Sequence, residues 1–214
     1  TPPRCRSEDL DVAAEDIGYN LNIATGDLCS AFVALCNLAF SGRTYEPRIV
    51  EYSQQAAETL AKTMIAGFGL SPTAVHDLSA LATQLENAYR GRTRGAEARR
   101  RFAAAIRALD GKTKVAHEAR YHKGPVERLA RTAERVAGTL RLQTEWLRWY
   151  ATRNPEMCEA AVAAGREIAD TAGLVQGMRG FDRLAPELQA RVRAWGEEGQ
   201  SIADAFDRAT GHDR

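Results

Sequence analysis

The strongest constraint in this sequence is a set of apolar residues that recurs every seven positions. The repeat comprises Leu10, Ile17, Ala24, Ala31 and Leu38, with Ala14, Leu21, Leu28 and Leu35 between them. An alternating step of three and four residues keeps such side chains on one side of an α-helix. The spacing therefore predicts one long helix that begins near Ser7 and ends at Ser41-Gly42, with its apolar stripe packed against other helices.

Proline marks where further helices begin, because the first turn of a helix has no partner for the amide that proline lacks. We expect helices to begin at four such sites: Glu46-Pro47, Ser71-Pro72, Asn154-Pro155 and Pro186. Small residues dominate the helix after Asn154-Pro155, so a neighbouring helix can approach it closely. The tryptophans Trp146, Trp149 and Trp195 fit the apolar stripes and are expected in the core, with a ligand groove lined by Trp146 and Trp149 as the alternative.

Glycines predict interruptions in the middle of the chain. Gly91 and Gly95, with repelling arginines between them, favour an elbow at residues 90–95 over a helix that continues to Leu109. A second interruption is expected at Asp110-Gly111. The pair Gly124-Pro125 predicts a boundary between sub-bundles near residues 123–125.

No stretch shows the alternation of apolar and polar residues, or the β-branched enrichment, that is typical of a strand. The expected fold is therefore all-α, an elongated antiparallel bundle of five to seven helices with heptad-type packing. We expect residues 1–214 to form a single helical-bundle domain.

Charge is distributed unevenly along the chain although the net charge is only +1. Residues 90–123 carry eleven Lys or Arg against three acidic residues, whereas residues 1–89 carry five basic against eleven acidic residues. The candidate binding residues are the arginines of this basic island that lie closest together: Arg90, Arg92, Arg94, Arg99, Arg100 and Arg101. They could neutralise phosphates of a nucleic acid or of anionic lipid headgroups. The alternatives are a solvated connector between helices and a contact with an acidic protein partner.

No residue set supports a catalytic, metal or cofactor site, so we expect none of these. His117 and His122 are five residues apart and do not share a helix face, unlike the histidines of HExxH metalloproteases. Glu118 and His122 do share a face, and the expected role for them is an ordinary surface pair. The interpretation of His76 beside Asp77 is the same, and enzyme activity remains a minor alternative to a non-enzymatic role.

The cysteine pattern lacks the spacing of a zinc site. We expect buried free thiols, with a pair between Cys5 and Cys158 as the alternative if the protein is exported. No apolar run is long enough to span a bilayer. The composition thus favours a soluble cytoplasmic protein and leaves export open.

Two functions follow from this pattern. Long helical rods commonly join other proteins, so the first hypothesis is a non-enzymatic interaction or scaffold module that binds a protein partner and can form homo-oligomers. The alternative is a polyanion-binding protein that uses residues 90–123 to bind nucleic acid or an anionic membrane surface.

Overall fold

The computed structural model describes residues 7–41, 47–87, 95–122 and 125–210, and the side chains of residues 16–36, 51–87, 95–109 and 133–208. Its elements in chain order are α1 (Ser7–Ser41), α2 (Pro47–Gly67), α3 (Leu78–Asn87), α4 (Ala96–His122), α5 (Pro125–Ala151), the 3-10 turn η1 (Pro155–Met157), α6 (Cys158–Gly177), the 3-10 turn η2 (Phe181–Arg183) and α7 (Pro186–Thr210). No strand occurs within these ranges.

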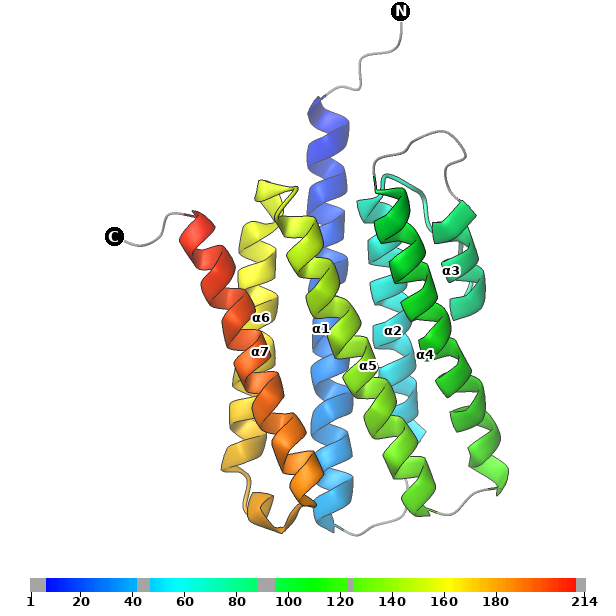
Figure 1. Ribbon diagram of the computed structural model, residues 1–214, viewed down its shortest axis with the longest axis vertical. Helices are drawn as coiled ribbons and strands as arrows, with labels where there is room; N and C mark the ends of the chain where they lie inside the picture. The colour runs from blue at the N-terminus through cyan, green and yellow to red at the C-terminus, as the bar shows by residue number, and fades with distance from the viewer. Residues whose placement is uncertain (1–6, 42–46, 88–94, 123–124, 211–214) are drawn as a thin grey trace, which may run out of the picture.

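The helices lie side by side in an elongated bundle, and α4, α5, α6 and α7 alternate in direction (Figure 1). Helix α1 runs through the middle, between α2 on one side and α6 on the other, and its first turns project beyond the neighbouring helices. This arrangement confirms the predicted all-α antiparallel bundle with heptad-type packing.

The apolar stripe of α1 is buried wherever its side chains are described. The buried stripe positions are Ile17, Leu21, Ala24, Leu28, Ala31 and Leu35. Two clusters of buried side chains follow one another along the bundle. The first includes Phe102 and Trp146, and the second includes Phe32 and Trp195.

The predicted start of the third helix at Ser71-Pro72 is wrong, because α3 begins at Leu78. The Asp77 carboxylate accepts a hydrogen bond from the Ala80 amide at 3.0 Å, which satisfies one exposed amide of the first turn. Gln84 of α3 holds the preceding segment in place. Its side chain accepts a hydrogen bond from the Thr73 amide at 3.0 Å and donates one to the Ser71 carbonyl at 2.7 Å.

The predicted interruption at Asp110-Gly111 is also wrong, because α4 continues through it to His122. A single glycine inside a helix costs only about 1 kcal/mol, which packing of α4 against α3 and α5 can outweigh. Elsewhere, α3 ends at Asn87 and α4 begins at Ala96, so most of the expected elbow at 90–95 lies outside the described residues. Gly95 itself has a left-handed φ of 82°.

Candidate interaction surfaces

Gly95, which precedes α4 in the arginine-rich part of the chain, contacts an aromatic cluster at one end of the bundle. This cluster combines Phe68, just after α2, with Phe102 of α4 and Trp149 of α5. The Trp149 ring lies 4.9 Å from the Phe68 ring and 5.9 Å from the Phe102 ring, measured between centroids. A Cβ atom on Gly95 would lie 3.3 Å from Phe68 and 3.9 Å from Trp149, so the start of α4 rests directly on these rings.

Two exposed arginines lie over rings of this cluster. The Arg153 guanidinium lies 4.7 Å from the Trp149 ring centroid, and that of Arg101 lies 5.0 Å from the Phe102 centroid. Such placement over an aromatic face is a favourable cation–π contact. Arg100 is exposed one residue before Arg101. We call Arg100, Arg101, Arg153 and Trp149 the basic end of the bundle.

The candidate binding residues of the sequence therefore separate into three groups. Arg100 and Arg101 are exposed, whereas Arg99 is only 5% exposed and faces the interior. Arg90, Arg92 and Arg94 lie outside the described residues. Arg153 was missed from sequence because it is 52 residues beyond Arg101 and reaches the same end only through the antiparallel packing of α4 and α5.

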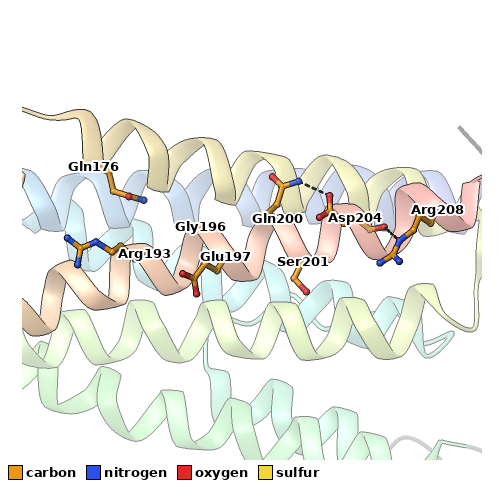
Figure 2. A pocket seen from close by; sticks show the side chains of 8 residues that line it. All are labelled: Gln176, Arg193, Gly196, Glu197, Gln200, Ser201, Asp204 and Arg208. Atoms are coloured by element: carbon orange, nitrogen blue, oxygen red, sulfur yellow. Dashed lines mark hydrogen bonds between the residues drawn. The ribbon is translucent and has the colours of Figure 1, made fainter. Parts of the chain in front are cut away.

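An open groove of about 710 Å³ lies along α6 and α7. Its lining residues are Gln176, Arg193, Gly196, Glu197, Gln200, Ser201, Asp204 and Arg208, as Figure 2 shows. Gln200 donates a hydrogen bond to the Asp204 carboxylate at 2.7 Å, and the Arg208 Nε atom donates to the Asp204 carbonyl at 3.0 Å. These side chains thus form hydrogen bonds with residues of their own helix, and the groove is lined by both acidic and basic residues.

Large apolar side chains are exposed on the outer face of α1 and α6. Tyr19 is 67% exposed and Ile23 is 39% exposed, one turn apart on α1. Leu174, on the adjoining helix α6, is 69% exposed. Tyr19 and Ile23 lie off the heptad repeat of α1, which is why they face away from the core.

Two of the three tryptophans, Trp146 and Trp195, occupy the core. Trp146 is fully buried and stacks on Tyr150 with centroids 4.7 Å apart, while Trp195 packs 3.9 Å from Phe32. Trp149 is half-buried at the basic end.

The thiols of Cys29, Cys36 and Cys158 are free and buried, whereas Cys5 lies outside the described residues. Burial raises the pKa of the Cys29 thiol to about 11 and that of Cys36 to about 12. Both thiols therefore stay protonated at neutral pH and are poor nucleophiles and metal ligands.

The remaining polar candidates form no metal centre in the described part of the chain, where no group of three or more His, Cys, Asp or Glu could hold an ion. The side chains of His117, Glu118 and His122 lie outside it. The His76 Nδ1 atom lies 2.9 Å from a Glu58 carboxylate oxygen on the surface, and Lys62 lies 2.6 Å from the same oxygen. None of the helices described combines the length and hydropathy that a bilayer-spanning segment requires.

The fold and these surfaces define a helical-bundle module with two outward-facing patches. The model of the HEPN domain family matches residues 29–170, from within α1 to within α6. Because this match covers more than half of the sequence, the chain belongs to the HEPN domain family. Members are helical bundles that are often involved in nucleotide or RNase activity or in protein interaction. No curated protein and no solved structure gives a significant match.

Proposed function

We propose that the chain is a non-enzymatic helical interaction module that binds a protein partner, self-association included. The observation that carries the proposal is the exposure of Tyr19, Ile23 and Leu174 on two adjoining helices. Removing apolar surface from water contributes roughly 25 cal/mol per Å², so covering this face favours association. Apolar side chains that gather on the surface of a soluble domain commonly mark an interaction site, and Tyr19 and Ile23 lie one turn apart on α1.

The family supports the same proposal, since HEPN domains often dimerise. A direct test compares the native chain with a Tyr19→Ser, Leu174→Ser double variant. Light scattering after gel filtration measures self-association, and chemical cross-linking in extract of the source cells measures other partners. We expect the variant to remain helical by circular dichroism and to lose the association. A native chain that stays monomeric and cross-links to no protein would contradict the proposal.

A second candidate, polyanion binding, is favoured by the basic end. The Arg153 guanidinium lies over the half-buried Trp149, and Arg100 and Arg101 are exposed on the neighbouring helix α4. An indole face beside cations suits bases and phosphates alike. HEPN domains can bind nucleic acids. Neutralised phosphates release counterions, so this binding would weaken steeply as salt rises.

The test uses fluorescence anisotropy with a labelled single-stranded RNA, and co-sedimentation with phosphatidylserine vesicles. We expect Arg100→Glu with Arg101→Glu to abolish binding at low salt. The matched control is Arg179→Glu with Arg191→Glu, which changes charge equally at exposed positions between α6 and α7 and on α7. If both double variants lost the same affinity, the effect would come from net charge alone. If the native chain showed no salt-dependent binding, polyanion binding would be ruled out.

A further inference from the structure

The outer face of α1 and α6 combines its apolar side chains with acidic residues. Helix α1 carries six acidic residues and neither lysine nor arginine. Of these acids, Asp16 and Asp27 have described side chains, Asp16 exposed and Asp27 half-buried. On α6, Glu159, Glu167 and Asp170 are exposed. The exposed Arg166 of α6 is paired with Asp207 of α7. A partner that covers Tyr19, Ile23 and Leu174 must therefore be compatible with an acidic surrounding.

Ion pairs inside the bundle neutralise some of its acidic side chains, and those described on this face are not among them. Four acidic side chains outside it have a basic partner, in the pairs Glu58–Lys62, Glu86–Arg107, Glu198–Arg148 and Asp207–Arg166. Among the described residues, no ion pair is found for Asp16, Asp27, Glu167 or Asp170. The face thus presents carboxylates whose charge is not matched within the part of the chain that the structure describes.

Two of these carboxylates lie close to the seam between the helices. A Cβ atom on Gly26 would lie 3.7 Å from a Glu167 carboxylate oxygen, so Glu167 extends over the glycine of α1. Partial burial raises the pKa values of Asp27 and Glu167. Their ionised forms are poorly solvated, and a cation from outside would stabilise them.

We propose that the outer face of α1 and α6 binds a basic amphipathic helix of a partner protein, a refinement that rests on the proposed interaction function. Apolar side chains of such a helix would cover Tyr19, Ile23 and Leu174, and its lysines or arginines would pair with Asp27 and Glu167. This is the helix-on-groove mode of recognition, in which apolar anchors are spaced at three and four residues and charges flank them.

A second copy of this chain does not supply that helix. Its most basic helix is α4, but the apolar stripe of α4, at Phe102, Ile106 and Leu109, is already buried in its own bundle. The partner helix needs a basic flank and an apolar stripe that is still available. The occupant is therefore a different protein segment.

The test uses the full chain and a synthetic Leu/Lys peptide of about 18 residues, five helical turns, with leucines at helical spacing. Two control peptides have the same leucines with glutamate in place of lysine, or the same composition in scrambled order. Fluorescence anisotropy at moderate salt measures affinity. We expect the Leu/Lys helix to bind at least about tenfold more tightly than either control, a difference of about 1.4 kcal/mol.

Variants locate the binding on the face. Asp27→Asn with Glu167→Gln, and separately Tyr19→Ser with Leu174→Ser, should each weaken the peptide about tenfold. Asp182→Asn with Glu187→Gln removes the same charge at exposed positions near the start of α7 and should leave affinity unchanged. Equal weakening by this control pair, or equal binding of the scrambled peptide, would overturn the proposal.

The experiments distinguish failure of the basic-helix proposal from failure of the proposed interaction function. A native homodimer that Tyr19→Ser with Leu174→Ser dissociates, together with no preference for the Leu/Lys helix, would overturn the basic partner and leave the interaction module standing. A monomer that captures neither peptide nor protein would overturn both.

Discussion

Two helix seams of this bundle show different uses of glycine. In the seam between α6 and α7, a Cβ atom on Gly165 would lie 2.7 Å from the Gly199 carbonyl oxygen, and one on Gly199 would lie 2.6 Å from the Gly165 carbonyl oxygen. In the seam between α4 and α5, a Cβ atom on Gly138 would lie 2.8 Å from a Leu109 methyl carbon. The first contact is with backbone, and the second is with the end of a flexible side chain.

The space around the two seams differs as well. A cavity of about 250 Å³ lies beside Gly138, lined also by Ala105, Leu109 and Leu142. The Leu109 side chain therefore has room to move, whereas the α6 and α7 backbones could separate only by moving whole helices. The cost of adding a methyl group at a glycine therefore depends on which atoms it would meet. Closely packed backbones cannot relax locally, whereas a flexible side chain can move aside.

The largest expected effect is at the α6–α7 seam. Gly199→Ala places a methyl group against the Gly165 carbonyl and the backbone of Ala169, so the helices must separate. We expect a loss of about 3 kcal/mol in the free energy of unfolding, measured by urea denaturation.

Gly173→Ala on α6 is the matched control, because the added methyl group would have no atom of another helix within 4 Å. It should raise stability by about 0.5–1 kcal/mol, since alanine loses less backbone entropy on folding. If Gly199→Ala were as stable as the native chain, the close contact of the α6 and α7 backbones would be wrong.

A smaller effect is expected at the α4–α5 seam. In Gly138→Ala the gain in helix propensity, about 1 kcal/mol, opposes the displacement of the Leu109 side chain into the cavity. The two contributions should leave stability within about 1 kcal/mol of the native value in the same denaturation experiment. A loss as large as that of Gly199→Ala would show that the α4–α5 seam is equally unable to relax.

The smallest effect concerns a third glycine seam, where the Glu167 carboxylate lies over Gly26. Burial raises the pKa of Glu167 above its ordinary value of 4.5, so folding disfavours the ionised form. This carboxyl group destabilises the folded chain progressively as pH rises from about 4.5 through its raised pKa, and its effect vanishes below that window.

Glu167→Gln should therefore raise the melting temperature slightly at pH 7 and leave it unchanged at pH 4, as followed by circular dichroism. Glu187→Gln on the exposed start of α7 is the control and should show no such pH-dependent gain. A lower melting temperature for Glu167→Gln at pH 7 would mean that ionised Glu167 stabilises the fold.

Much of the architecture could be predicted from residue spacing. The stripe of α1, for example Leu21 and Leu28, is buried as its heptad repeat indicated. The small residues of α6 indicated close approach of a neighbour, and Gly165 makes that approach to α7. These predictions succeed because a helix places residues three and four apart on one face whatever surrounds it.

Features that depend on contacts between distant segments could not be predicted in this way. The start of α3 at Leu78 depends on Gln84, which bonds Ser71 and Thr73. Arg99 belongs to the same run as Arg100 and yet is buried, because its position on α4 faces the bundle. Which of two neighbouring arginines is exposed depends on the direction in which each points from the helix and on what packs there. The composition of the arginine-rich segment does not give this information.

The sequence by itself determined that this chain forms long amphipathic helices, because periodic burial of leucine and alanine requires only local geometry. Tertiary structure alone decided which surfaces remain outside the core. It brought Arg153 to the arginines of α4, closed α6 on α7 through two glycines, and left Tyr19 and Leu174 exposed among acids. Helix formation depends on residues close together in the sequence, whereas an interaction surface consists of the side chains that remain exposed after all the helices have packed.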